Sequence, residues 1–278
     1  TLLLQGKLIA GWEKYEWRWD SIQKSQKRDF KQPLWDGTSL KGKSILVHTE
    51  QGLGDAIQFV RYVDLLCDLD TTVIVECQAE LKPLFTSIDR IDKLVTKEGK
   101  TPNFDVHVPL LSLPHIFGTT LKTIPARIPY LYPDTKADSI FLLDNNHKFK
   151  IGIAWAGNSK HVNDHNRSID LKRFECLLNI GNCEFFSLQV GVRRDDIKQY
   201  GYHHIIKDLG KQFTNFHHTA SAILQLDLVI SVDTAVAHLA GALGKPVWTL
   251  LSFIPDWRWM LNRSDSPWYP SMTLFRQK

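Results

Sequence analysis

The chain has 278 residues, enough for about two domains of ~150 residues, and its 43% hydrophobic and 23% charged content is ordinary for a soluble globular protein. No apolar run approaches the ~18 residues of a spanning helix, and the four cysteines lack C-x-x-C spacing. The composition therefore excludes a membrane span, disorder, a collagen and a disulfide scaffold. The 34 Lys and Arg exceed the 30 Asp and Glu without forming a basic block, which favours an anionic small ligand over nucleic acid.

The first 22 residues predict short helices. An apolar side chain recurs every three or four positions, at Leu4, Leu8, Trp12, Tyr15 and Trp19. Gly6 and Gly11 interrupt this stripe and predict a break within it. The chain opens on Thr1 rather than Met, so we expect it to be part of a longer protein; with no signal peptide, we expect it in the cytoplasm.

Strands then alternate with helices in two series. The first has strands over 44–49, 71–76, 93–96 and 105–108 and helices over 56–67 and 79–87. After a region rich in proline and polar residues (125–148), the second has strands over 150–155, 184–188, 204–206, 228–231 and 246–250, with helices over 171–180, 193–200, 215–225 and 235–243. Such alternation predicts mostly parallel sheets with right-handed connections.

We therefore predict an α/β protein with two Rossmann-like, doubly wound domains facing a cleft. The domains cover residues 35–145 and 146–278, preceded by the helices of residues 1–22. Tryptophans gather near both termini, so we expect the C-terminal tail to pack back on the N-terminal segment. Ligands of such sheets bind outside the carboxyl ends of the strands, where candidate site residues are expected.

A glycine pair follows the first predicted strand. Gln51-Gly52-Leu53-Gly54-Asp55 leads into the helix that starts near Ala56, so the backbone could approach a ligand closely at a helix N-terminus. As a dinucleotide fingerprint the motif has Ile57 in place of the third glycine, although Glu76 ends the second strand where a ribose-binding acid is expected. Asp55 is therefore either a helix cap or a general base.

A second glycine-containing match precedes that strand. Residues 37–44 read G-x-x-x-x-G-K-S, the phosphate-binding loop pattern, but a strand follows the motif where a helix is required. We interpret this match as a coincidental turn.

The segment Asp233–His238 follows the buried strand 228–231 and opens a helix of small residues. Thr234 and the amides of Ala235 and Val236 are therefore placed to bind phosphate at the positive end of the helix. His238 lies one turn further along, where it either faces a ligand or belongs to the core.

The polar loop 156–168 (AGNSKHVNDHNRS) follows strand 150–155 and is long for a simple connection. Lys160, Arg167 and Ser168 are natural partners of a diphosphate. His161 and His165 hint at a metal, but no third ligand has the required spacing, so we expect no metal site.

Five segments together resemble a known family. They are Val47–Tyr62, Ile153–Asn158 with Asn166–Ser168, Asp233–His238, Pro255–Trp259 and Ser266–Pro270. They resemble the glycosyltransferase-like C-terminal domain of bacterial tetratricopeptide-repeat proteins, a relative of the lipopolysaccharide heptosyltransferases (family 9 glycosyltransferases). Gly6–Trp19 is similar to the tail of a tetratricopeptide repeat, which implies further repeats upstream.

The resemblance implies a GT-B fold and a metal-independent, inverting transfer of a sugar from a nucleotide-diphosphate donor to a protein or glycan acceptor that the upstream repeats would recruit. Asp55 matches the family's base, Asp233, Thr234 and His238 match its phosphate-binding segment, and Ala235 replaces a glycine. The predicted nucleotide-sugar site consists of Gln51, Gly52, Gly54, Asn158, Lys160, Arg167, Ser168, Gln189, Asp233, Thr234, Ala235, Val236 and His238. No cofactor besides the donor is expected.

Two other functions stay open at this point. The first is a catalytically inactive scaffold whose repeats recruit a partner. The second is an NAD-binding oxidoreductase, which requires the missing third glycine and ranks last.

Overall fold

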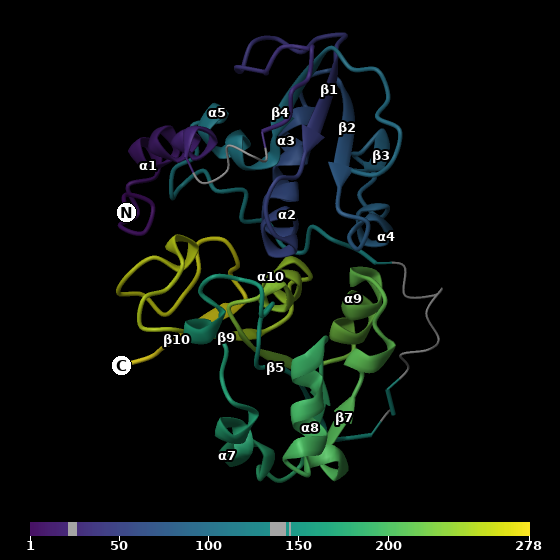
Figure 1. Cartoon of the computed structure of the whole chain (residues 1–278), viewed down its shortest axis with the longest axis vertical. Helices are drawn as coiled ribbons and strands as arrows, with labels where there is room; N and C mark the ends of the chain where they lie inside the picture. Colours follow the sequence, from purple (N-terminus) through teal and green to yellow (C-terminus); the bar gives the residue numbers. More distant parts are fainter. Residues whose placement is uncertain (22–26, 134–142, 145) are drawn as a thin grey trace. The chain divides into compact units, whose positions relative to one another are not determined.

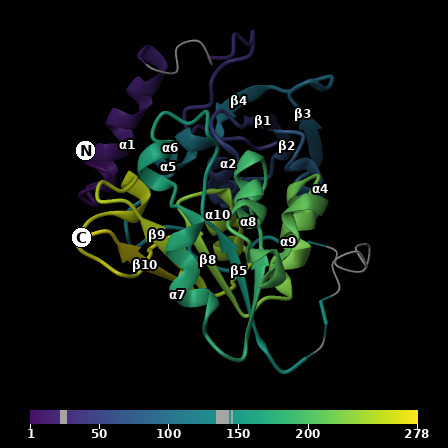
Figure 2. The ribbon, with the colours of Figure 1, turned by 60° about the horizontal axis from the view of Figure 1, so that its bottom comes forward.

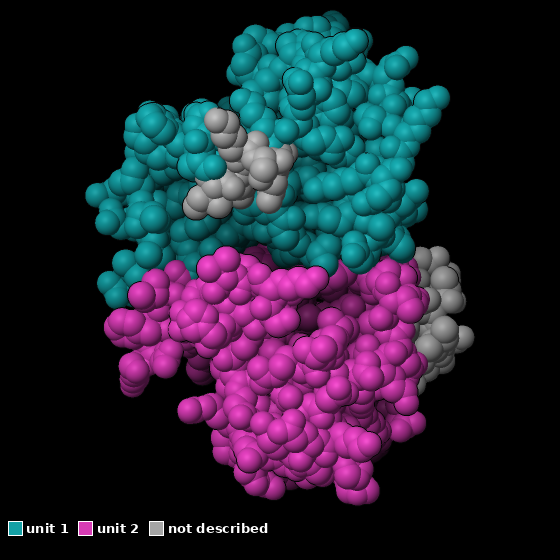
Figure 3. Space-filling view, viewed as in Figure 1, with its two compact units in different colours: residues 1–127, 256–262 teal, residues 128–255, 263–278 magenta. Residues whose placement is uncertain are grey.

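The computed structural model describes residues 1–21, 27–133, 143–144 and 146–278. The chain divides into two compact units, which Figure 3 draws in teal and magenta. Unit 1 consists of Thr1–Arg127 and Asp256–Asn262, and unit 2 consists of Ile128–Pro255 and Arg263–Lys278. In the described ranges, no helix combines the length and apolar character that crossing a bilayer requires.

Unit 1 is built on a parallel sheet of four strands in the order β3-β2-β1-β4. The strands are β1 (Ser44–His48), β2 (Thr72–Cys77), β3 (Lys93–Thr96) and β4 (Val106–Pro109) (Figure 1). The central strands are runs of fully buried aliphatic residues, such as Ile45-Leu46-Val47, as expected for a parallel sheet covered on both faces.

The helices of unit 1 are short. They are α1 (Leu8–Tyr15), α2 (Leu53–Phe59), α3 (Val63–Cys67), α4 (Lys82–Phe85) and α5 (Leu113–Ile116), with 3-10 turns over Glu16–Asp20, Val60–Tyr62 and Leu110–Ser112. The helix predicted over 56–67 is thus divided in two. Arg61 Nε donates to the Gln58 carbonyl at 2.7 Å, and that carbonyl would accept the Tyr62 N–H in a continuous helix.

The N-terminal segment belongs to unit 1. Its predicted break lies at Gly6, whose φ of +75° favours glycine. Gly11 instead lies inside α1, where a side chain would collide with Leu3. Trp12 is buried and donates from Nε1 to the Thr119 carbonyl at 3.1 Å. The origin of this segment in a tetratricopeptide repeat stays a prediction.

Unit 2 contains a parallel sheet of six strands in the order β10-β9-β8-β5-β6-β7. The strands are β5 (Phe149–Ala154), β6 (Cys183–Ser187), β7 (Ile206–Asp208), β8 (Leu228–Val232), β9 (Val247–Leu251) and β10 (Met272–Arg276). Figure 2 shows β10, β9, β8 and β5 in this sequence across the sheet. The sheet confirms four predicted strands, whereas the strand predicted over 204–206 is found at Ile206–Asp208, after a 3-10 turn over Tyr202–His204. It also adds β10, which the sequence pattern did not indicate.

The longest described helices of unit 2 are α9 (Phe216–Leu224) and α10 (Ala235–Ala242), which precede and follow β8 in the chain. Shorter ones are α6 (Asp164–Arg167), α7 (Glu175–Leu178) and α8 (Asp196–Gln199), the last two preceded by 3-10 turns over Leu171–Phe174 and Val192–Asp195. A core of Trp155, Phe174, Phe185 and their neighbours packs against the sheet.

The border between the units falls near residue 127, whereas the sequence pattern placed it at 145. Tyr130 explains the difference, because its N–H donates to the Ala242 carbonyl at 3.0 Å and so ties this stretch to α10. Residues 134–142 and 145 of the predicted border region lie outside the described residues.

The segment Asp256–Asn262 also belongs to unit 1, whereas the C-terminal residues Arg263–Lys278 belong to unit 2. The ring of Trp257 packs edge-on against that of Trp12, with centroids 5.3 Å apart. The motif over residues 37–44 is a turn at Lys41-Gly42 that leads into β1, which confirms its interpretation as coincidental.

Candidate functional site

The glycine motif of unit 1 forms the start of α2. Gly52 is the extended residue before the helix, and Asp55 lies in the first turn. The Asp55 Oδ2 atom accepts the Gly52 N–H at 2.8 Å, so the carboxylate caps the helix from within its first turn. Asp55 therefore caps the helix, but this hydrogen bond uses only one oxygen of its carboxylate.

The other oxygen of Asp55 is paired with a residue from the far end of the chain. Arg258 Nη2 contacts Asp55 Oδ1, and the Arg258 side chain is 7% exposed against 19% for Asp55. Burial disfavours the charge of Arg258, yet the carboxylates of Asp256 and Asp55 outweigh it and raise the pKa of the guanidinium above its usual value. Asp55 thus lies beside a permanent cation.

The residues just before α2 bind the N-terminal segment. Gln51 Nε2 donates to Tyr15 Oη at 2.7 Å. Glu50 is buried, and its Oε1 accepts from Arg18 Nη2 at 3.0 Å and from the Leu111 N–H at 3.2 Å. Burial raises the pKa of Glu50 to about 7, although Arg18 opposes the shift. Nothing in the local sequence indicated these partners, because they lie more than 30 residues away.

The start of α10 is the corresponding feature of unit 2. Thr234 is its extended N-cap residue, and its hydroxyl lies 3.2 Å from that of Ser231 at the end of β8. Asp233, Thr234, Ala235 and Val236 are half-buried, so this helix end is partly open to solvent. The first N–H groups of a helix have no acceptor within it and carry its positive partial charge, which suits an anion.

Loop 156–168 brings a cation to this helix end. Arg167 Nη1 donates to the Asp233 carbonyl at 3.2 Å, and its Nε lies 3.4 Å from Asp164 Oδ1. Ser168 Oγ accepts the Gly157 N–H at 3.0 Å and donates to the same Asp164 oxygen at 2.9 Å. The structure therefore brings Arg167 and Ser168 into one network with Asp233.

The remaining predicted residues of this loop are placed differently. Asn158 and Lys160 are exposed, and the Asn158 Oδ1 atom accepts the Lys160 N–H at 3.0 Å in a local turn. These contacts do not connect them to α10.

Gln189 and His238 lie below the surface. The Gln189 amide accepts from the Trp155 and Ala156 N–H groups and donates to the Ala156 and Val190 carbonyls. It is 4% exposed and holds the start of the loop in place. His238 is 5% exposed, and its Nδ1 lies 2.9 Å from Tyr269 Oη. Both positions are those of core residues that support the loop and α10 from beneath.

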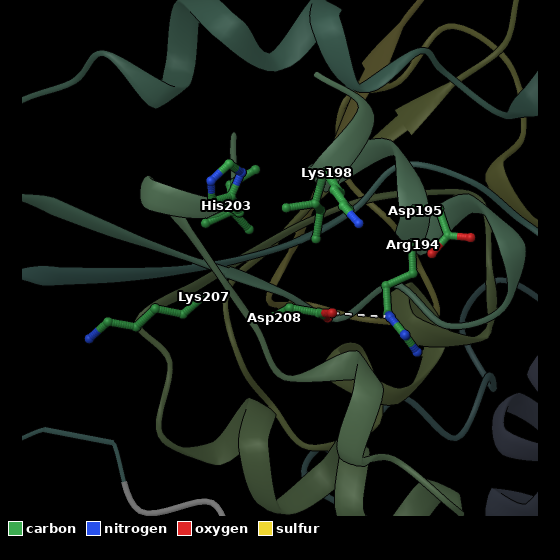
Figure 4. Close-up of a pocket in the computed structure, with 8 residues that line it drawn as sticks. Arg194, Asp195, Lys198, His203, Lys207 and Asp208 are labelled. Carbon is green, nitrogen blue, oxygen red and sulfur yellow. Dashed lines mark ion pairs between the residues drawn. The ribbon is translucent and has the colours of Figure 1, made fainter. Parts of the chain in front are cut away.

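A separate hollow of about 470 Å³ lies beside β7 and α8. None of the predicted site residues lines it; the lining consists of Arg194, Asp195, Ile197, Lys198, His203, Ile206, Lys207 and Asp208. Figure 4 shows the ion pair between Arg194 and Asp208, whose atoms are 3.0 Å apart. Because Arg194 already pairs with Asp208 and no predicted site residue lines this hollow, we prefer the end of α10 as the anion site.

The dinucleotide alternative fails at Glu76. A ribose-binding acid must face the ligand, but Glu76 is fully buried and accepts from Arg28 Nη1 at 2.6 Å and from Nη2 at 3.2 Å. In the part of the chain that the structure describes, no three His, Cys, Asp or Glu side chains gather as metal ligands do.

Comparison with known proteins finds a family match in this part of the chain. Residues 207–274, which contain the start of α10, match the model of glycosyltransferase family 9 (heptosyltransferase). The chain is 24% identical over 306 aligned positions to protein FlbA of Caulobacter vibrioides, covering 99% of this chain and 50% of that protein. The chain thus spans about half the length of this relative.

Solved structures of glycosyltransferases share the fold. A family 9 glycosyltransferase from Veillonella parvula has a TM-score of 0.60 at 12% identity, covering 87% of this chain and 88% of that one. The ADP-heptose lipopolysaccharide heptosyltransferase II of E. coli has a TM-score of 0.59 at 12% identity (84% and 91%). E. coli heptosyltransferase WaaC, solved with ADP-2-deoxy-2-fluoro heptose, has a TM-score of 0.57 at 9% identity (84% and 93%).

These similarities confirm an α/β fold with two parallel sheets that resembles the GT-B fold of heptosyltransferases. The family 9 sequence match covers residues 207–274. The matches include no tetratricopeptide repeat.

Proposed function

We propose that the chain is an inverting glycosyltransferase that uses a nucleotide-diphosphate sugar, with an ADP-sugar as its donor. The half-open start of α10, where Arg167 meets the Asp233 carbonyl, carries this proposal. It lies within the segment that matches family 9. The choice of ADP is supported by the related heptosyltransferase WaaC, which was solved with ADP.

In this proposal the donor diphosphate binds at the N-terminus of α10. Thr234 and the Ala235 and Val236 amides contribute hydrogen-bond donors, and Arg167 contributes a fixed positive charge. During transfer, the bond between the anomeric carbon and the β-phosphate oxygen breaks, and its electron pair leaves with the diphosphate. The helix end and Arg167 stabilise this growing negative charge, so the proposed mechanism needs no divalent metal.

Asp55 is the proposed proton acceptor. The acceptor hydroxyl oxygen attacks the anomeric carbon from the face opposite the diphosphate, which inverts its configuration, and the hydroxyl proton passes to the Asp55 carboxylate. The acceptor is a protein or a glycan. Supporting this role, Asp55 keeps an exposed edge at 19% although one oxygen binds Gly52 and the other Arg258.

Calorimetric titration with ADP, UDP and GDP, each with and without EDTA, tests the proposal. We expect binding of ADP that EDTA leaves unchanged. Arg167→Met should weaken ADP binding about tenfold or more, because it removes a charge-assisted contact. Arg194→Met is the matched control, since Arg194 is also paired with an aspartate but lines the hollow beside β7.

The outcomes separate the competing functions. Loss of ADP affinity in Arg194→Met but not in Arg167→Met would place the nucleotide in the hollow beside β7. Absence of binding to all three nucleotides would refute the transferase and favour an inactive scaffold.

A further inference from the structure

The segment Asp256–Asn262 leaves unit 2 after β9, contributes seven residues to unit 1 and returns to unit 2 before β10. A 3-10 turn over Trp257–Trp259 gives it a defined shape, and Asp256 caps this turn by accepting the Arg258 N–H at 3.1 Å. The Trp257 ring packs against those of Trp12 and Tyr15, with centroids 5.3 and 5.9 Å away. The segment is therefore fixed on unit 1 by aromatic packing.

Arg258 is the side chain that this packing places in the interior. Its guanidinium donates from Nε to Gln58 Oε1 at 2.7 Å and from Nη1 to Asp256 Oδ1 at 2.8 Å, and Nη2 contacts Asp55. It also lies over the Trp257 ring, 4.3 Å from the centroid. Burying a guanidinium is costly unless its donors are matched, and here three acceptors surround it.

The consequence for Asp55 is a fixed orientation. One oxygen is held by Arg258 and the other by the Gly52 N–H, so the carboxylate can turn little about its bond to Cβ. A carboxylate offers about four acceptor positions, more than the two that these contacts use. Asp55 is more exposed than Arg258, at 19% against 7%, so the pair presents its carboxylate side to solvent.

We propose that Arg258 is a positioning residue for Asp55: it holds the carboxylate in the orientation that accepts a proton, and it does not touch the substrate. The proposal rests on the proposed function, in which Asp55 is the base.

The test measures ADP release from ADP-heptose, with water as acceptor, for Arg258→Gln, Arg258→Lys, Asp55→Asn and the double variant Asp55→Asn/Arg258→Gln. Arg263→Gln is the control. It removes an arginine five positions from Arg258 that pairs with Asp265 instead of Asp55. Thermal melting of each variant identifies any that does not fold. If Arg258→Gln does not fold, Arg258→Lys, which keeps the positive charge, takes its place in the test.

We expect Arg258→Gln to lower kcat about 100-fold, the size of effect that misplacing a catalytic group by about 1 Å produces. The KM for ADP-heptose should stay unchanged, and Arg258→Lys should recover part of kcat. The double variant should be no slower than Asp55→Asn, because Arg258 acts through Asp55.

Wild-type kcat in Arg258→Gln, or a double variant slower than Asp55→Asn, would overturn the positioning role alone. A wild-type chain that neither binds ADP nor releases it from ADP-heptose would overturn the proposed function and this role with it. The two failures are thus distinguishable.

Discussion

Glu50 gives the sharpest prediction on stability. It lies two residues after β1 and five positions before Asp55, and its side chain is 2% exposed. Its Oε1 accepts from Arg18 and from the Leu111 N–H, whereas its Oε2 has no hydrogen-bond partner among the described residues. Glu50→Gln keeps the accepting oxygen and places an uncharged amide where the unpartnered oxygen lies. The variant therefore resembles the protonated form of Glu50.

Burial raises the pKa of Glu50 from 4.5 to about 7 in the folded chain. A carboxyl whose pKa is raised by folding contributes stability that is fully present below its unfolded pKa and lost as the pH rises through its folded pKa. The interval of about 2.5 pH units, at about 1.36 kcal/mol per unit, corresponds to about 3 kcal/mol. Wild type should thus lose about 3 kcal/mol relative to Glu50→Gln between pH 4.5 and pH 8.

Urea unfolding of both proteins, followed at several pH values from 4.5 to 8, measures this difference. Subtracting one pH curve from the other removes the groups that the two proteins share. We expect similar free energies of unfolding near pH 4.5 and a more stable Glu50→Gln variant at pH 8. A difference in unfolding free energy that does not change with pH, or one that grows in favour of wild type, would refute the raised pKa of Glu50 as the cause.

Three further substitutions probe the support of the α10 site. Gly157→Ala places a methyl group against Arg167 and Asp164, so it should cost about 1–3 kcal/mol in unfolding free energy and weaken ADP binding. Gln189→Leu leaves the buried Trp155 and Ala156 N–H groups without their acceptor and should cost about 3 kcal/mol, measured by urea unfolding. Tyr269→Phe removes the hydroxyl beside His238 and should cost about 1 kcal/mol. Tyr269→Phe should leave ADP affinity unchanged in calorimetry, and a large loss there would place His238 in the site.

Most of the fold could be predicted because the strands are short, buried aliphatic runs between polar turns. Residues 44–48 and 228–232 are of this kind, and each leads directly into a helix. β10 was not predicted because it follows an irregular stretch rich in proline and tryptophan. Its residues alternate between buried and exposed, which is typical of an edge strand.

The candidate site was only partly predictable, since its partners are distant in sequence. Arg258 and Asp55 are 203 positions apart, and a local sequence pattern cannot predict a contact over that separation. Gln189 and His238 were both included in the predicted nucleotide-sugar site. Their burial depends on Ala156 and Tyr269, which come from other elements of unit 2.

Inverting sugar transfer is tested by the anomeric configuration of the sugar that is released first. The related heptosyltransferase TibC was solved with ADP-D-beta-D-heptose. With this donor and water as acceptor, proton NMR within the first minutes of reaction reports the configuration of the free heptose before it equilibrates. Inversion at the anomeric carbon predicts the α-anomer from wild type and almost none from Asp55→Asn. First release of the β-anomer, or equal rates in the two proteins, would contradict it.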